Sequence, residues 1–187
     1  MIKKANLEEA KLIYTKHMIK DFPDDEIPEY DRFIKLTEEK MHDIYLFEKD
    51  EKQVAYFISV EKNNNILITH LAVMEEFRSK GIGKIFLNEI KNYFSDKNMI
   101  IVEVEAEIRA NNEEELNIIR KRKKYYLNSD FVQCDNMTYI LYGVQYDILI
   151  CKLNDSVQYN NFEIKKIIEE IYSKLRINES KLQIKLD

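Results

Sequence analysis

The chain has 187 residues, of which 45% are hydrophobic and 34% are charged, and its formal net charge is −5. This length and composition suit one folded domain with a core of its own. Only three glycines and two prolines are present, which argues against disordered and fibrous classes. The acidic balance argues against nucleic-acid binding and against attachment to an anionic membrane, so neither partner is expected.

The first nine residues contain neither the apolar stretch nor the cleavage site of a signal peptide. The longest apolar runs are also shorter than a membrane span. Cys134 and Cys151 do not form a metal-ligand spacing, and without an export signal we interpret them as reduced thiols. These features predict a cytoplasmic protein without a metal site.

The periodicity of apolar residues predicts the helices and strands in chain order. The first half is expected to contain a strand at 1–5, helices at 7–19 and 29–42, and strands at 44–48, 53–61 and 66–73. The second half is expected to contain helices at 81–94, 112–128 and 162–175, and strands at 99–107, 138–141 and 146–153. Asn6 and Glu9 form a capping box for the first helix, and a turn at Gly143 joins the last two strands. This order predicts a layered α/β (α+β) domain.

Residues 71–84 are the most informative segment, because a strand, a loop and a helix start follow one another there. Gly81 and Gly83 stand one residue apart, and glycine lets a backbone approach a ligand closely. The first N–H groups of a helix have no partner within it and carry the positive end of its dipole. Three basic residues add positive charge: Arg78, Lys80 and Lys84. The segment therefore predicts a pyrophosphate site, with glycines that serve packing alone as the alternative.

Two other phosphate motifs fit this segment poorly. A P-loop would need glycine and Ser or Thr where the chain has Arg78 and Ile85. The dinucleotide fingerprint would need a small residue in place of Phe86, and it would follow the first strand of a βαβ unit.

The pattern Arg78-x-x-Gly81-x-Gly83, directly after the strand 71–73, resembles the acyl-CoA signature of the GNAT superfamily of N-acetyltransferases. The resemblance implies that a bulge interrupts this strand, that its backbone holds the pantetheine, and that an N–H at Val73 faces the thioester carbonyl. It implies that the turn and the helix start bind the pyrophosphate. The residues that it assigns to acetyl-CoA here are Leu71, Ala72, Val73, Arg78, Ser79, Lys80, Gly81, Ile82, Gly83 and Lys84.

The resemblance covers nearly the whole family fold, residues 1–153. We therefore expect an acetyltransferase domain at 1–153, with a GNAT-like mixed, mostly antiparallel central sheet flanked by helices. Residues 154–187 are expected to add a C-terminal helical extension packed on the same domain.

A second segment, 125–131, resembles the family's Phe-Tyr-x-x-x-Gly-Phe. The match implies that Tyr126 faces the CoA sulfur, where a phenol of pKa about 10 can protonate the thiolate of a thiol of pKa about 8.5. Asp130 replaces the glycine, and aspartate tolerates a left-handed conformation better than most residues. The alternative is that Tyr126 packs the helix against the sheet. Asn111 or Asn112 is expected to bond the pantetheine, with plain N-capping as the alternative.

The general base is left open by the sequence. Many relatives carry a glutamate two residues before the Leu-Ala-Val segment, where this chain has Thr69. Glu105 is the candidate base; together with Glu103 and Glu107 it alternates onto one strand face, and exposure to water is the alternative for each. His70 has a suitable pKa but could simply pack beside the strand, and an amine could also lose its proton through ordered water.

The acceptor site is expected at the irregular segment 22–30, because in the family this connection borders the substrate cleft. Its acidic residues, Glu26 among them, would attract a cationic amine, while Phe22 and Tyr30 offer apolar walls. Thr69 is the fourth expected substrate contact. The alternative is a solvated acidic loop, and the basic run 120–124 is likewise expected to be a solvated helix face.

These observations predict an N-acetyltransferase that moves an acetyl group from acetyl-CoA, its co-substrate, to a primary amine by direct attack on the thioester. The acceptor would be a small-molecule or peptide amine. The alternative is a catalytically weak CoA-binding sensor or interaction module, which Thr69 and Asp130 keep open. The C-terminal helix could cover the domain or pair two chains into a homodimer.

Overall fold

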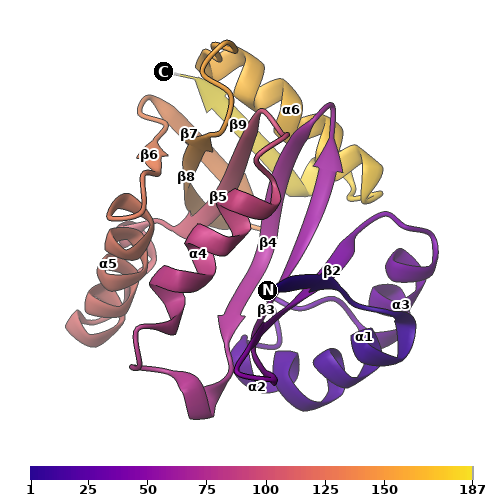
Figure 1. Ribbon diagram of the computed structural model, residues 1–187. Helices are drawn as coiled ribbons and strands as arrows, with labels where there is room; N and C mark the ends of the chain where they lie inside the picture. Colours follow the sequence, from indigo (N-terminus) through magenta and orange to yellow (C-terminus); the bar gives the residue numbers. More distant parts are fainter. Residues whose placement is uncertain (187) are drawn as a thin grey trace. The chain divides into compact units, whose positions relative to one another are not determined.

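The computed structural model describes residues 1–186, drawn as a ribbon in Figure 1. These residues divide into two compact units. The first contains Met1–Val60 and Ile68–Tyr93, and the second contains Glu61–Leu67 and the chain from Phe94 on. Each unit has antiparallel strand pairs and helices, which confirms the predicted mixed α/β class with a mostly antiparallel sheet flanked by helices.

In the first unit the strands are ordered β1-β2-β3-β4. Its elements are β1 (Ile2–Lys4), α1 (Leu7–Ile13), η1 (Tyr14–Met18), α2 (Ile19–Asp21), α3 (Tyr30–Glu38), β2 (Asp43–Lys49), β3 (Lys52–Lys62), β4 (Asn65–Val73), η2 (Glu75–Phe77) and α4 (Ile82–Tyr93). The adjoining ends of β3 and β4 belong to the second unit.

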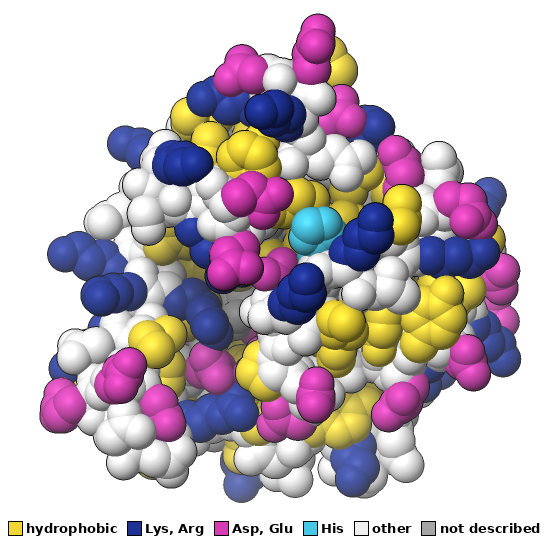
Figure 2. All heavy atoms as spheres, turned by 90° about the horizontal axis from the view of Figure 1, so that it is seen from below, with side chains coloured by type: hydrophobic (Ala, Val, Ile, Leu, Met, Phe, Trp, Pro, Cys, Tyr) yellow, Lys and Arg dark blue, Asp and Glu magenta, His cyan; other side chains and the backbone are white. Residues whose placement is uncertain are grey.

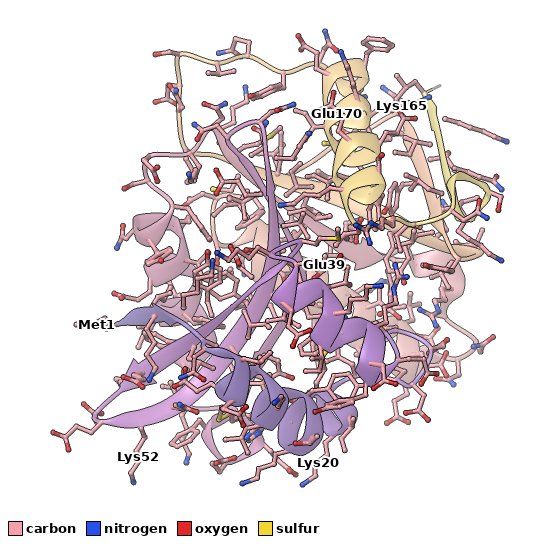
Figure 3. The ribbon with its side chains drawn as sticks, turned by 90° about the vertical axis from the view of Figure 1, so that its right-hand side faces the viewer. Met1, Lys20, Glu39, Lys52, Lys165 and Glu170 are labelled. Atoms are coloured by element: carbon pink, nitrogen blue, oxygen red, sulfur yellow. The ribbon has the colours of Figure 1, made fainter. Side chains whose placement is uncertain are left out.

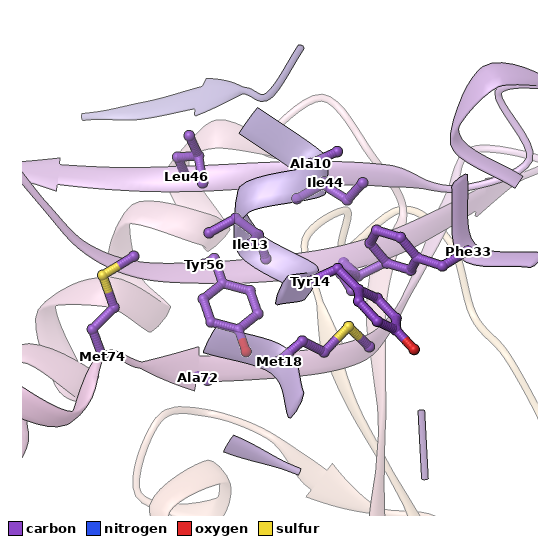
Figure 4. Packing of buried hydrophobic residues seen from close by; sticks show 11 residues of the cluster. Ala10, Ile13, Tyr14, Met18, Phe33, Ile44, Leu46, Tyr56, Ala72 and Met74 are labelled. Atoms are coloured by element: carbon purple, nitrogen blue, oxygen red, sulfur yellow. The ribbon is translucent and has the colours of Figure 1, made fainter. Parts of the chain in front are cut away.

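Helices cover both faces of the β2–β3 pair in the first unit. Ile44 and Leu46 of β2 join α1, η1 and α3 in a buried cluster, which Figure 4 shows from close by. The alternate residues of β2 point to the other face, where Phe47 stacks on Phe86 of α4 with ring centroids 5.2 Å apart. This alternation follows from the two-residue repeat of a strand, which sends successive side chains to opposite faces.

Two helix predictions for the first unit need correction. The helix expected at 29–42 ends at Glu38, because Lys40 takes a left-handed conformation with φ of 54°. The helix expected at 7–19 contains a π-helical turn, η1, before it closes with α2. The capping box is confirmed, since Asn6 and Glu9 each accept a hydrogen bond from the other's backbone at 2.9 Å.

In the second unit the strands are ordered β5-β8-β7-β9, and β6 pairs with β8. Its elements are β5 (Met99–Glu105), η3 (Glu107–Arg109), α5 (Glu113–Leu127), β6 (Val132–Gln133), β7 (Met137–Leu141), β8 (Val144–Lys152), α6 (Asn161–Lys174), η4 (Glu179–Lys181) and β9 (Leu182–Leu186). The turn at Gly143 is confirmed, with φ of +84° between paired Leu141 and Val144. β6 and β9 were not predicted, and β5 ends two residues early because η3 begins at Glu107.

The C-terminal helix α6 packs within the second unit. Its buried isoleucines form one face, and Glu170, labelled in Figure 3 with Lys165, accepts a hydrogen bond from Asn63 at the β3–β4 turn. Among the described residues, no helix combines the length and the hydrophobicity needed to cross a membrane.

Candidate active site

The turn between β4 and α4 has an open side at Gly81. Ser79 and Gly81 both take positive φ values, 60° and 74°, in the left-handed region. A Cβ built on Gly81 would meet no heavy atom of the described residues within 4 Å. Packing therefore does not require glycine here; the backbone conformation does. An open turn directly before the first turn of α4 is a geometry that suits an approaching phosphate group.

Arg78 is bound within the protein itself. Its Nε donates to the carbonyl of Val73 at 2.9 Å, and its guanidinium forms an ion pair with Asp21 at the end of α2. Arg78 is also one of the residues expected to hold acetyl-CoA, and that contact remains a prediction. In the structure the guanidinium joins the end of β4 to the end of α2.

The other two basic residues of the turn, Lys80 and Lys84, are exposed. Lys80 donates to the carbonyl of Glu76 at 2.6 Å, and its ammonium lies 5.7 Å from the centroid of the Phe77 ring. Lys84 is exposed in the first turn of α4. Figure 2 shows basic and acidic side chains interspersed over one face of the molecule, so positive charge is available only locally.

The last residues of β4 differ in burial. Ala72 is buried in the cluster of the first unit, whereas Leu71 and Val73 are half-buried. The N–H of Met74 donates to the carbonyl of Val54 at 3.0 Å, which ties the end of the strand to β3. The expected contacts of these residues with the pantetheine remain predictions.

The segment 22–30 is held in place by backbone carbonyls that accept bonds from core side chains. The hydroxyl of Tyr14 donates to the carbonyl of Pro28 at 2.7 Å, and its ring meets the ring of Tyr30 edge-on at 5.2 Å. Within the segment, the N–H of Glu26 donates to the carbonyl of Pro23 at 3.0 Å. These bonds fix the backbone of the segment, while its role as an acceptor site remains a prediction.

His70 anchors the same segment from β4. Its ring meets Phe22 edge-on with centroids 5.0 Å apart, and its Nε2 lies 3.0 Å from the carbonyl of Glu26. A carbonyl only accepts, so Nε2 carries a proton. Burial lowers the pKa of His70 to about 4, so the ring is neutral at pH 7, and its Nδ1 lies 3.0 Å from the hydroxyl oxygen of Thr69. Both nitrogens are therefore engaged, which argues against His70 as the base.

In the second unit, the end of α5 forms the predicted turn. Asp130 takes a φ of 67°, which confirms that aspartate can replace the family's glycine there. The N–H of Phe131 donates to the carbonyl of Tyr126 at 3.3 Å, and the two rings meet edge-on at 5.3 Å. Tyr126 is buried, and burial raises the pKa of its hydroxyl to about 12. The phenol is therefore fully protonated at pH 7.

Glu103 and Glu105 of β5 do not lie in open water, contrary to the exposure alternative weighed for them, whereas the side chain of Glu107 in η3 is 41% exposed. Glu105 is paired with Arg109 at 2.8 Å and with Arg122 at 2.5 Å, and its side chain is 14% exposed. Glu103 accepts hydrogen bonds from the hydroxyls of Tyr139 and Tyr172. Burial raises the pKa of Glu103 to about 7, and the two hydroxyls offset part of this rise.

Four of the five basic residues at 120–124 are exposed, which confirms the predicted solvated helix face, and three of the five also form ion pairs. Besides Arg122, which binds Glu105, Arg120 binds Glu107 at 2.9 Å and Lys123 binds Asp147 at 2.8 Å. The positive charges of these side chains are thus directed at the unit's own carboxylates.

The two asparagines before α5 serve the helix. Asn112 is the N-cap, since its side chain accepts from the N–H of Glu115 at 2.9 Å. Asn111 donates to the carboxylate of the same Glu115 at 3.0 Å. For Asn112 the capping alternative is confirmed, and a contact of Asn111 with pantetheine stays a prediction.

The structure brings three of the four predicted substrate residues together in the first unit, where Phe22, Glu26 and Thr69 all contact His70, and the fourth, Tyr30, contacts Tyr14. Sequence reasoning missed Asp21 and Tyr56, whose hydroxyl donates to Asp21 at 2.9 Å. Neither residue belongs to a local motif, so no signal in the sequence marks them.

Comparisons with known proteins place these features in context. A family model described as Acetyltransferase (GNAT) family matches residues 7–122. A search of curated protein sequences finds no match.

Solved structures share the fold at low sequence identity. A protein assigned to the GNAT family from Bacteroides thetaiotaomicron superposes with a TM-score of 0.72 at 16% identity, covering 94% of this chain and 96% of that one. Spermidine N-acetyltransferase from Vibrio cholerae, in complex with CoA and spermine, gives 0.58 at 10% identity, covering 82% and 95%. The ribosomal-protein-S18-alanine N-acetyltransferase from Escherichia coli gives 0.53 at 12% identity, covering 85% and 99%.

Proposed function

The chain belongs to the acetyltransferase (GNAT) family, and from this premise we propose that it transfers an acetyl group from acetyl-CoA to a primary amine. The observation that carries the proposal is the turn at Gly81. It combines a positive φ, an open side and the start of a twelve-residue helix, α4. Backbone N–H groups of such a turn can bind pyrophosphate oxygens without help from a cationic side chain.

The reaction joins the amine nitrogen to the acetyl carbon, breaks the carbon–sulfur bond and moves one proton from the amine. The carbonyl oxygen needs a donor as charge develops on it, and an N–H at Val73 is the proposed donor. The departing thiolate gains from a nearby hydrogen-bond donor, which is the proposed role of Tyr126.

The environment of Tyr126 favours hydrogen bonding to the thiolate over proton transfer to it. With its pKa raised to about 12, outright proton transfer to a thiolate of pKa about 8.5 is uphill by about three units. A hydrogen bond from the phenol to the sulfur carries no such cost. We therefore assign Tyr126 as a hydrogen-bond donor to the leaving group, with the final proton supplied by solvent.

The amine proton is best taken by water. The two carboxylate oxygens of Glu105 already bind the guanidinium groups of Arg109 and Arg122, so neither is left to approach an amine. His70 has both nitrogens engaged. Loss of the proton to ordered water, the route that needs no dedicated base, agrees with both observations.

The acceptor is proposed to be a cationic amine. The segment 22–30 carries three consecutive acidic residues, and its backbone is fixed by Tyr14 and His70. Phe22, Tyr30 and Thr69 are the proposed neighbours of the amine. The named acceptors of two family members, spermidine and a ribosomal protein, show that the fold can serve small and peptide amines alike.

A thermal-shift experiment tests the first requirement, cofactor binding. Acetyl-CoA at about a hundred times its dissociation constant should stabilise the protein by roughly 2.7 kcal/mol, whereas NADH and ATP should give much less. No shift in a folded sample would refute the proposal.

A binding module without turnover is the second candidate, favoured by the engaged state of Glu105 and His70. Release of free thiol from acetyl-CoA, measured against a panel of polyamines, amino acids and peptides, separates the two. Binding without amine-dependent thiol release would select the module.

A further inference from the structure

Asp21 is a buried carboxylate outside every motif that the sequence offers. It ends α2 and is followed at once by Phe22. Its side chain is only 5% exposed, and both oxygens have partners: Oδ2 accepts from Tyr56 and Oδ1 is paired with Arg78. Because a buried carboxylate without partners is costly, these two contacts stabilise Asp21 in this position.

Arg78 connects Asp21 to the phosphate-binding turn. Besides the ion pair, its Nε donates to the carbonyl of Val73, five residues back, and so closes the loop between the end of β4 and Arg78. The planar guanidinium can make both contacts at once because its donors form a fixed fork. One side chain thus ties the start of the segment 22–30 to the loop that leads to Gly81.

We propose that Asp21 is a positioning residue: by holding Arg78 it keeps the loop between Val73 and Gly81 in the shape whose backbone amides bind the pyrophosphate of the acyl donor. The ligand in this inference rests on the proposed function, but the arrangement of the loop can be measured without it. Arg78 accordingly shapes the turn and does not bind the phosphate.

The two possible roles of Arg78 predict opposite changes in the affinity for acetyl-CoA when the charge of Asp21 is removed. If Arg78 bound phosphate directly, Asp21 would compete for the guanidinium and repel the anion, so its removal would strengthen binding. If Arg78 shapes the loop, removal of Asp21 frees the side chain, loosens the loop and weakens binding.

Calorimetric titration with acetyl-CoA measures whether the affinity rises or falls. Asp21→Asn is expected to weaken acetyl-CoA binding about five- to tenfold. This loss is smaller than the full contribution of a charge-assisted hydrogen bond, because the contact acts on the ligand only through the loop. Asp31→Asn, which removes the same charge from an exposed position on α3, is the matched control and should change affinity less than about twofold. Unchanged or tighter binding in folded Asp21→Asn would overturn the proposal.

Hydrogen–deuterium exchange of the ligand-free protein tests the loop independently of acetyl-CoA. Amides of residues 74–81 should exchange at least about fivefold faster in Asp21→Asn and at the parent rate in Asp31→Asn. Equal rates in all three proteins would contradict the proposal. A parent protein that fails to bind acetyl-CoA would refute the proposed function alone, because the exchange rates would still decide the role of Asp21.

A second pair of variants covers a failure of Asp21→Asn to fold. Arg78→Lys keeps the positive charge but removes the planar set of guanidinium donors, and Arg78→Gln removes both the charge and these donors. If the guanidinium must contact Asp21 and Val73 at the same time, both variants should speed the amide exchange of residues 74–81 to a similar extent. Parent-like exchange in Arg78→Lys would show that charge alone suffices and would overturn the proposed geometry.

Discussion

The imidazole of His70 lies edge-on to the ring of Phe22, with centroids 5.0 Å apart, while its Nε2 holds the carbonyl of Glu26. One side chain of β4 therefore fixes two residues of the segment proposed to bind the amine. Since the backbone of Glu26 is held in this way, a change to its side chain should act on charge without moving the segment.

Glu26→Gln should raise the KM for cationic amines about two- to fivefold and leave acetyl-CoA affinity unchanged, because it removes one partly exposed charge. Steady-state kinetics with a diamine, and with a monoamine that carries no other charged group, measure the change in KM. Glu29→Gln, exposed in the same segment, is the control and should change less. Equal effects on the amine and on acetyl-CoA would place Glu26 outside the acceptor site.

Gly81→Ala should weaken acetyl-CoA binding, since a methyl group would stand on the open side of the turn. Gly143→Ala is a closely matched control: both glycines have positive φ, and a Cβ at either meets no described atom within 4 Å. Both substitutions should therefore lower the free energy of unfolding by roughly 1 kcal/mol. Loss of acetyl-CoA affinity in Gly81→Ala alone supports the site, whereas parent affinity in that variant would make the turn structural.

Tyr126→Phe should lower kcat about tenfold, which is less than the 10²- to 10⁴-fold typical of a general acid, because the thiolate can leave without full protonation. Binding of acetyl-CoA should persist. Tyr125→Phe removes the adjacent hydroxyl and is the control. The assignment would be wrong if Tyr125→Phe lost activity while Tyr126→Phe kept it.

The cluster of Glu103, Tyr139 and Tyr172 predicts a pH-dependent contribution to stability. A carboxyl whose pKa rises from 4.5 to about 7 on folding binds more protons in the folded state within that range. Its contribution is therefore full below pH 4.5 and is lost as the pH rises toward 7. His70, with its lowered pKa, acts in the opposite direction between pH 6.5 and 4, so a variant is needed to separate them.

Glu103→Gln should accordingly gain stability relative to the parent as the pH rises from 5 to 8, by roughly 1–3 kcal/mol in the free energy of unfolding. Urea denaturation at both pH values measures this difference. Glu107→Gln is the control, because pairing with Arg120 lowers the pKa of Glu107 from 4.5, so its titration lies below this pH range and its difference from the parent should hardly change between pH 5 and 8. A parent-to-Glu103→Gln difference that is the same at both pH values would contradict the assignment.

The sequence could predict features that neighbouring residues encode. The capping box at Asn6, the left-handed turn at Asp130 and the hairpin at Gly143 each follow from a few adjacent residues. β9 also carries a local signal, the alternation of Leu182, Ile184 and Leu186, which was missed because the strand is short and follows a turn.

The partners of charged groups could not be predicted, because folding alone brings them together. Arg78 and Asp21 are 57 residues apart in the chain, and Glu103 and Tyr172 are 69 apart. The sequence therefore marked Arg78 by its motif but could not predict its ion pair with Asp21. The expected domain boundary at residue 153 and the proposed roles in catalysis remain predictions.

Transfer of a labelled acetyl group tests the central claim most directly. The protein would be incubated with acetyl-CoA carrying a ¹³C-labelled acetyl group and with a panel of primary amines, and the products analysed by mass spectrometry. The account predicts labelled acetyl on an amine nitrogen, with one free thiol released for each product formed, and loss of both in Gly81→Ala. Tight binding of acetyl-CoA with no labelled amine, or thiol release that does not depend on any amine, would contradict it.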